Sequence, residues 1–247
     1  MSPKYRFPIT IYDSTEKLTE GATTLIRATL RRTSNDRTVS MVLAGGTTPK
    51  PVYESLRALE DIDWRNVHFF FGDERPVGPD HEDSNYRMAN ETLLQHIPVP
   101  EANVHRMRGE MGSAVAAEAY EQEIRDTLRV EDGQIPRFDL VLLGMGADGH
   151  TASLFPDTPA LLEDDRLAVA NTVPQLETTR ITLTYPVLNA ARQVLFLTTG
   201  EDKACAFKQV MTGDAQSAPP AAHVQPERGE VLWLVDLEAA RKLSNDA

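Results

Sequence analysis

Alternating strand-like and helix-like segments predict a three-layer α/β/α sandwich with a mainly parallel, Rossmann-like central sheet. Two observations support this fold class. Short apolar runs typical of buried strands alternate with helical segments along all 247 residues, and several runs lead into glycine-rich or polar loops. Because no repeat or linker divides the chain, we expect one domain over residues 1–247.

Capping residues and apolar periodicity define the elements in the first half of the chain. Asp13 and Glu16 resemble an N-cap pair, so a helix should follow Asp13 and end near residue 32. Pro49 suits the first turn of a helix, and apolar residues recur at helical spacing from Ser113 onward. The expected strands are residues 8–12, 39–43 and 67–71, and the further expected helices are residues 49–59, 85–95 and 113–128.

The second half of the chain continues the alternation. Strands are expected at residues 138–143, 167–172, 181–184, 194–198 and 231–235, with a helix over 202–211 and a short helix at the end. Residues 213–226 are rich in alanine and proline, and we expect a surface excursion because a strand and a helix still follow. The one cysteine, Cys205, lies in a predicted helix, where we expect a small packed side chain. A single cysteine is consistent with a reducing compartment.

Charge and composition exclude several classes of protein. The net charge of −12 argues against a non-specific nucleic-acid binder and against binding to anionic membranes. The N-terminal residues lack the apolar core of a secretory signal, and no apolar run of about 18 residues could span a membrane. We therefore expect a cytoplasmic protein with a small-molecule partner, and an anionic ligand would need a locally basic site.

The most informative stretch is GMGADGHTASLFP, residues 144–156, which follows the apolar run at residues 140–143. In an open α/β sheet, the loops at the carboxyl ends of strands bind ligands. Glycines such as Gly146 let a ligand approach the backbone closely, and Asp148 and His150 suggest general acid–base chemistry. The alternative is an ordinary strand-to-helix turn in which Asp148 caps the helix and His150 is exposed.

A second loop, AGGTTP at residues 44–49, lies between a predicted strand and a predicted helix. Gly45 and Gly46, with the hydroxyls of Thr47 and Thr48 at a helix N-terminus, indicate an anion site. The loop is neither a Walker A loop nor a GxGxxG loop, which favours a small phosphate ester over a nucleotide. A plain turn with Thr48 as the N-cap is the alternative, and both interpretations can hold together.

Charged residues follow a third predicted strand. Asp73, Glu74 and Arg75 could orient a polyol and hold an anion, although such clusters are often structural ion pairs. The polar loop at residues 81–86 contains Asn85. A metal site is not expected there, because the acids and histidine lack a recognisable ligand spacing.

Cationic side chains complete the candidate site. Lys203 stands in the first turn of the helix at 202–211, where a bound anion would offset the unfavourable helix dipole, although a solvated surface lysine is common. Arg180 is a weaker candidate of the same kind. His68 and His105 have no comparable setting, and we interpret them as structural. The four loops should form one cleft that combines hydroxyls, acids, a histidine and cations.

Five pieces of the sequence occur in the order found in one known family and cover nearly the whole chain. They are AGGTTPKPVYESL, FFFGDERPVGPDHEDSNYRMANETLL, FDLVLLGMGADGHTASLFP, RITLTYPVLNAARQVLFLTTGEDKA and PAAHVQPERGEVLWLVD. GDER with SNY, together with GxGxDGHTASLFP, is highly specific. On these motifs the chain resembles the 6-phosphogluconolactonases of the pentose phosphate pathway.

The resemblance implies the fold of sugar-phosphate isomerases and deaminases, and hydrolysis of 6-phospho-D-glucono-1,5-lactone to 6-phosphogluconate without cofactor or metal. His150 would be the general base, Asp148 would orient or tune it, and Asp73 would hold substrate hydroxyls. The residues assigned to substrate and phosphate binding are Gly45, Gly46, Thr47, Thr48, Arg75, Asn85, Gly146, Arg180 and Lys203. We expect a monomer or a small homo-oligomer.

The sequence also departs from its relatives and leaves two rivals. Many members have a serine at the position of Thr47, and residues 175–179 differ from the family before Arg180. A glucosamine-6-phosphate deaminase would place an acid within residues 152–156 and DEY rather than DER after the third strand. A non-catalytic sugar-phosphate sensor would normally carry a basic DNA-binding segment, which this sequence lacks.

Overall fold

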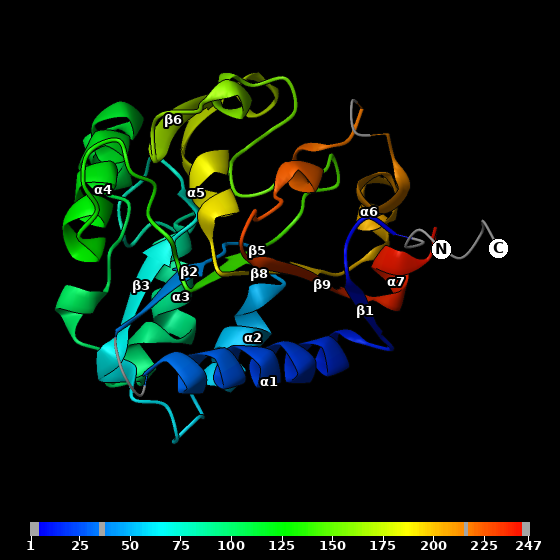
Figure 1. The fold of residues 1–247 in the computed structure, drawn as a ribbon, viewed down its shortest axis with the longest axis horizontal. Coiled ribbons are helices and arrows are strands. Elements are labelled where there is room, and N and C mark those ends of the chain that lie inside the picture. The colour runs from blue at the N-terminus through cyan, green and yellow to red at the C-terminus, as the bar shows by residue number, and fades with distance from the viewer. Residues whose placement is uncertain (1–4, 35–37, 215–216, 244–247) are drawn as a thin grey trace.

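The computed structural model describes residues 5–34, 38–214 and 217–243. A six-stranded sheet crosses the molecule between helices on both faces, which confirms the predicted fold class (Figure 1). The strand order is β1-β9-β8-β5-β2-β3, and every neighbouring pair is parallel. Its strands are β1 (Ile9–Tyr12), β2 (Val39–Leu43), β3 (Val67–Phe71), β5 (Leu140–Leu143), β8 (Gln193–Thr198) and β9 (Glu230–Asp236).

Helices cover the two faces of this sheet and create two hydrophobic cores. The helices of one face are α1 (Thr15–Ser34), α2 (Pro49–Leu56) and α3 (Asn85–Thr92). The helices of the other are α4 (Ser113–Leu128), α5 (Tyr185–Ala190), α6 (Ala204–Thr212) and α7 (Leu237–Ala240). Short 3-10 helices are Trp64–Asn66, Leu94–His96, Glu101–Asn103, Gly109–Met111, Pro159–Leu162, Pro174–Leu176, Glu201–Lys203 and Pro220–His223.

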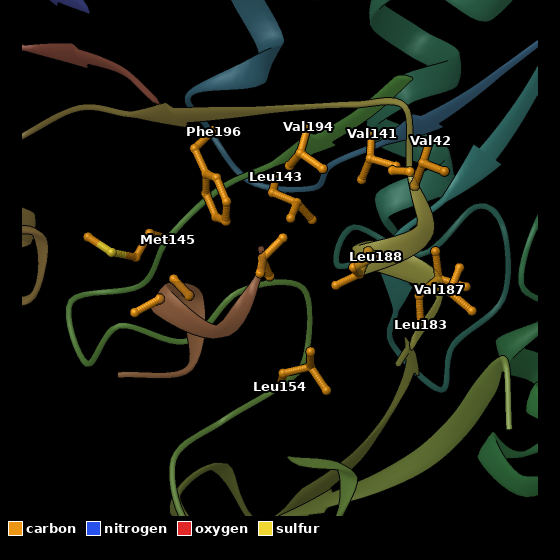
Figure 2. Packing of buried hydrophobic residues seen from close by; sticks show 14 of the residues in the cluster. Val42, Val141, Leu143, Met145, Leu154, Leu183, Val187, Leu188, Val194 and Phe196 are labelled. Atoms are coloured by element: carbon orange, nitrogen blue, oxygen red, sulfur yellow. The ribbon is translucent and has the colours of Figure 1, made fainter. Parts of the chain in front are cut away.

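Strand residues divide between the two cores because successive side chains point to opposite faces of a sheet. Val42 and Val141 belong to one core, whereas their neighbours Met41 and Leu142 belong to the other. Figure 2 shows the first core, where Val187 of α5 lies on the same side of the sheet as the strand valines. Both faces are buried, which explains why the strands read as continuous apolar runs rather than alternating ones.

A small antiparallel sheet stands apart from the central sheet. It consists of β4 (Asp73–Glu74), β7 (Thr178–Leu183) and β6 (Ala168–Val173), in that order. Asp73 pairs with Thr182, and Arg180 pairs with Asn171. The sequence predicts strands near both long segments, but their separation from the central sheet is a finding of the structure.

Three sequence-based expectations are wrong. Ser14, not Asp13, precedes α1, and the Ser14 hydroxyl oxygen accepts a hydrogen bond from the Lys17 amide (3.3 Å). Cys205 is exposed, because it lies on the solvent side of α6. The stretch at 213–226 is not a simple surface excursion: Ser217 and Gln225 are exposed, but Ala221 and Val224 are fully buried in the core. Its residues 215–216 lie outside the described residues.

Two helix ends also differ from the expected ranges. The helix expected at 49–59 ends at Leu56, and the one expected at 85–95 ends at Thr92 before a separate 3-10 turn. The predicted helix at 113–128 has the expected bounds and buries Ala117, Tyr120 and Ile124. Within the described ranges, no helix combines the length and the apolar character needed to cross a membrane.

Candidate active site

Four loops meet at one edge of the central sheet. The neighbouring strands β8, β5, β2 and β3 are parallel, so their carboxyl ends lie together and their following loops share one surface. These loops line a cavity of about 230 Å³, called the main cavity here because most of the predicted site residues line it. The predicted site residues that line it are Gly45, Gly46, Thr47, Thr48, Asp73, Arg75, Asn85, Gly146, His150 and Lys203.

The two remaining predicted residues, Asp148 and Arg180, line a side cavity of about 370 Å³. The main and side cavities share Asp73, Arg75 and His150, so His150 lies where the two spaces join. The predicted single cleft is therefore two adjoining spaces. Tertiary structure gathers all the predicted side chains, whose functional roles stay predictions.

His150 and Asp148 form a tight pair. The His150 Nδ1 lies 2.6 Å from Asp148 Oδ1, which also accepts the His150 backbone N–H (3.1 Å). Burial acts to raise the pKa of Asp148, but hydrogen bonds from His150 outweigh it and hold that pKa below its ordinary value. The ionised carboxylate therefore fixes the ring through Nδ1 and leaves Nε2 for chemistry.

The loop around His150 has no following helix. Phe155 stacks on the His150 ring with centroids 4.0 Å apart, and the next helical turn begins only at Pro159. The alternative interpretation, a strand-to-helix turn capped by Asp148, is therefore wrong. A Cβ atom on Gly146 would lie 2.1 Å from His150 Nδ1, so a glycine is needed for the ring to lie here.

The glycine-threonine loop opens the N-terminus of α2 to the main cavity, with Pro49 at the first turn. Thr48 stands at the N-cap position before Pro49, as the alternative interpretation has it, but it has helical backbone angles and its side chain makes no capping hydrogen bond. Its hydroxyl instead lies 3.0 Å from that of Thr199 on the loop after β8. A Cβ atom on Gly45 would lie 2.0 Å from Asn85 Oδ1, so Gly45 leaves room for that side chain.

The acids of the GDER motif divide into two roles. Asp73 faces the main cavity, where its carboxylate accepts Asn85 Nδ2 (3.1 Å) and the Ser153 hydroxyl (2.6 Å). Glu74 is buried and accepts the backbone N–H groups of Asn85 and Tyr86, each at 2.8 Å. Burial raises the pKa of Glu74 despite these bonds. Glu74 therefore holds the loop that supplies Asn85.

The cations of the site lie at both cavities. Arg75 makes no salt bridge with a described residue and donates to the Asp83 carbonyl oxygen, which excludes the alternative of an Arg75 ion pair within the motif. The Arg180 Nε is buried and has no hydrogen-bond partner among the described residues. Burial, and then the charge of Arg75, lower the pKa of Arg180. Neither arginine forms a salt bridge with a described carboxylate, although Asp73 and Asp148 line the same side cavity.

Lys203 differs from its expected setting. It ends the 3-10 turn Glu201–Lys203 before α6, rather than lying in the first α-helical turn. Its ammonium pairs with the exposed Asp202 carboxylate at 2.7 Å. Lys203 still lines the main cavity, as does the loop that precedes α2.

Sequence reasoning missed Ser153 and Thr199. Ser153 belongs to the quoted GHTASLFP motif, but its bond to Asp73 joins residues 80 positions apart in the chain, which no local pattern reveals. Among the described residues, no three His, Cys, Asp or Glu side chains form a group that could hold a metal ion.

The sequence matches the family described as glucosamine-6-phosphate isomerases/6-phosphogluconolactonase over residues 13–233. A 6-phosphogluconolactonase of Synechocystis sp. is 45% identical over 207 residues, which cover 83% of this chain and 84% of the relative. The solved structure of the 6-phosphogluconolactonase from Trypanosoma brucei superposes with a TM-score of 0.87 at 30% identity, covering 97% of this chain and 100% of that one.

A monomeric glucosamine-6-phosphate deaminase of known structure has a TM-score of 0.78 at 22% identity, covering 95% of this chain and 99% of that one. That likeness concerns the fold alone. The family match and the high identity to relatives over most of the chain are decisive: this chain belongs to the glucosamine-6-phosphate isomerase/6-phosphogluconolactonase family.

Proposed function

We propose that this chain hydrolyses 6-phospho-D-glucono-1,5-lactone to 6-phospho-D-gluconate in the oxidative pentose phosphate pathway, with His150 as the general base. The observation that carries this proposal is the His150–Asp148 pair at the junction of two cavities. The similarity to 6-phosphogluconolactonases supports the choice of substrate.

The chemistry suits this pair. A lactone is an activated ester, so hydrolysis needs an oriented water, a base and stabilisation of the developing oxyanion. With Nδ1–H donated to Asp148, the His150 Nε2 takes a proton from the water that attacks C1. The resulting imidazolium, stabilised by the Asp148 carboxylate, returns the proton to the ring oxygen as the C1–O bond breaks. The proton that His150 accepts from water is the one that it returns to the ring oxygen, so the step needs no further proton donor or acceptor.

The remaining polar groups suit a polyol phosphate. The loop before α2 offers the N–H groups of residues 46–48 to a phosphate, and the helix N-terminus and Lys203 add positive charge. Arg75 and Arg180 add cations beside the side cavity. Asp73 keeps free lone pairs that can accept substrate hydroxyls, since each carboxylate oxygen accepts more than one bond.

We also propose that residues 1–247 act as one domain, because both hydrophobic cores share the same central sheet. The same proposal places the protein in the cytoplasm as a monomer or a small homo-oligomer that needs no cofactor, metal or nucleic acid. Deamination of glucosamine 6-phosphate is disfavoured, because residues 152–156 contain no acid.

The test is direct assay of lactone hydrolysis. 6-Phosphogluconolactone is generated in situ at mildly acidic pH, where background hydrolysis is slow, and its loss is followed with wild-type protein, with His150→Ala and with His96→Ala. His96 is an exposed histidine outside both cavities and serves as the matched control. We expect His150→Ala to lower kcat by roughly 10²–10⁴-fold, the usual contribution of a general base, and His96→Ala to match wild type.

Each other outcome contradicts part of the proposal. Near-normal turnover by folded His150→Ala means that His150 is not the base. If wild-type protein does not accelerate lactone loss, a parallel assay of ammonia release from glucosamine 6-phosphate tests the deaminase. Binding of phosphogluconate without turnover in either assay would indicate a non-catalytic sugar-phosphate-binding protein.

A further inference from the structure

A buried amide lies behind the His150 loop. Asn171 of β6 is 1% exposed, and its Nδ2 donates both to the Ser153 carbonyl oxygen (2.8 Å) and to the Thr158 hydroxyl (2.9 Å). Its Oδ1 accepts the Ala160 N–H (3.4 Å). The Thr158 hydroxyl itself donates to the Phe155 carbonyl oxygen (2.7 Å), which leaves it free to accept from Asn171. One side chain thus holds both ends of residues 153–158.

The segment held in this way carries two contacts to the candidate site. The Ser153 hydroxyl donates to Asp73 Oδ2 at 2.6 Å, and the Phe155 ring stacks on His150. Both contacts lie beside the junction of the main and side cavities. Asn171 itself lines neither cavity, so it touches the site only through this segment.

The segment also needs to be held. Ala152 and Asp157, which flank residues 153–156, have positive φ angles of 47° and 60°. Such angles are unfavourable for residues other than glycine, and they persist only where surrounding contacts enforce them. The buried Asn171 bonds supply this enforcement, together with the Ser153 N–H donated to Thr182 Oγ1 (3.2 Å).

We propose that Asn171 is a positioning residue for the lactonase reaction: through Ser153 it orients Asp73, and through Thr158 and Phe155 it holds the ring of His150. The inference rests on the proposed function of the site. Asn171 stands opposite Arg180 in the small sheet, so the strand pair that supplies a cation to the side cavity also holds the His150 loop.

The test combines kinetics with a structural signal that does not need activity. Kinetics of lactone hydrolysis are measured for Asn171→Ala, Thr158→Val and Ser153→Ala, and for the double variant Asn171→Ala/Ser153→Ala. Proton NMR of the histidine rings reports the ring-current shift that Phe155 imposes on His150, with Phe155→Leu as calibration. Thr184→Val is the matched control, because Thr184 is buried in the same region and, among the described residues, its hydroxyl bonds only the Arg166 and Leu167 carbonyl oxygens.

We expect Asn171→Ala to lower kcat/KM by roughly 10- to 100-fold, as for other groups that orient a functional side chain from behind, and Thr158→Val to act in the same direction. Both should move the His150 ring signal toward that of Phe155→Leu. The double variant should lose less than the product of the two single effects, because Asn171 acts partly through Ser153. Thr184→Val should change thermal stability alone.

The proposal fails if folded Asn171→Ala keeps the wild-type kcat/KM and the wild-type His150 signal. If Asn171→Ala does not fold, Thr158→Val decides by the same two criteria. If wild-type protein does not hydrolyse the lactone, the proposed function fails, and the His150 signal alone still decides whether Asn171 positions the ring.

Discussion

Two histidine–carboxylate pairs in this molecule have similar geometry and different surroundings. His150 pairs with Asp148 at 2.6 Å, and His105 pairs with Glu123 of α4 at 2.9 Å. The His105 side chain is 7% exposed, and its other ring nitrogen bonds His68 at 2.9 Å. The His150 side chain is 29% exposed and lines both cavities.

The difference lies in what faces the second ring nitrogen. Both nitrogens of His105 are occupied within the protein, and its ring stacks on Phe70 with centroids 4.4 Å apart. At His150 one nitrogen is held by Asp148, and the ring lies at a glycine-lined opening. His105 and Glu123 also line a cavity, of about 340 Å³, so access to a cavity does not separate the two pairs. What separates them is the second ring nitrogen, which bonds His68 in one pair and is left for a ligand in the proposed role of the other. The interpretation of His68 and His105 as structural agrees with these contacts.

The largest expected effect is the contrast between His105→Ala, which should lower stability, and His150→Ala, which should lower kcat. His105→Ala leaves His68 and Glu123 without their partner and removes the stack on Phe70, so the free energy of unfolding should fall by about 2–4 kcal/mol. Urea unfolding measures this loss, and lactone hydrolysis should keep its kcat within a few-fold. A comparable loss of kcat in both variants would refute the division into a catalytic and a structural pair.

Neutralising the Asp148 carboxylate, which we propose supports the general base, should have a smaller effect. Asp148→Asn keeps an acceptor for His150 Nδ1 but removes the charge that stabilises the imidazolium, and charge-assisted hydrogen bonds are about twice as strong as neutral ones. We expect kcat to fall by roughly 5- to 30-fold, or about 1–2 kcal/mol of activation free energy.

The matched control for Asp148→Asn lies in the pair of His105 with Glu123. Glu123→Gln makes the equivalent change beside His105 and should leave kcat unchanged. Equal kinetic effects of Asp148→Asn and Glu123→Gln would contradict a specific role for Asp148.

The smallest expected effect is a change in pH dependence. Burial, and then the neighbouring His105, lower the pKa of His68 below its ordinary value of about 6.5. Between that lowered pKa and about 6.5 the unfolded chain binds more protons at this residue than the folded protein, so stability falls as pH decreases through this window. His68→Asn keeps a donor to His105 and should flatten this part of the curve of unfolding free energy against pH. An unchanged slope would show that His68 does not contribute.

Local patterns predicted much of the fold because their physical causes are local. The apolar runs at 39–43 and 67–71 have the observed strand bounds, and the periodic apolar residues of 113–128 give the observed helix. Predictions failed where packing decided. The alanine- and proline-rich stretch at 213–226 suggested a surface excursion, yet Ala221 and Val224 are buried because they cover the core, and the Ala221 N–H donates to the Gly149 carbonyl oxygen (2.9 Å).

The candidate site divides in the same way. The sequence was enough to assign the glycines, hydroxyls, acids and cations that follow apolar runs to one candidate site. Loops at the carboxyl ends of parallel strands meet at the same edge of a sheet, whatever the exact path of each loop. The partners of those residues could not be predicted, because Asp73 with Ser153 and Thr48 with Thr199 are joined only by the chain's path in space.

By itself the sequence determined the parallel α/β architecture, the family and the chemical inventory of the site, since these follow from hydrophobic pattern and motif. Only the tertiary structure decided which carboxylate serves which role. Burial behind the loop makes Glu74 a structural acid, while its neighbour Asp73 faces the cavity, because successive side chains of a strand point in opposite directions. Tertiary structure likewise gives His105 a protein partner at each ring nitrogen, whereas the ring partner of His150 among the described residues is Asp148.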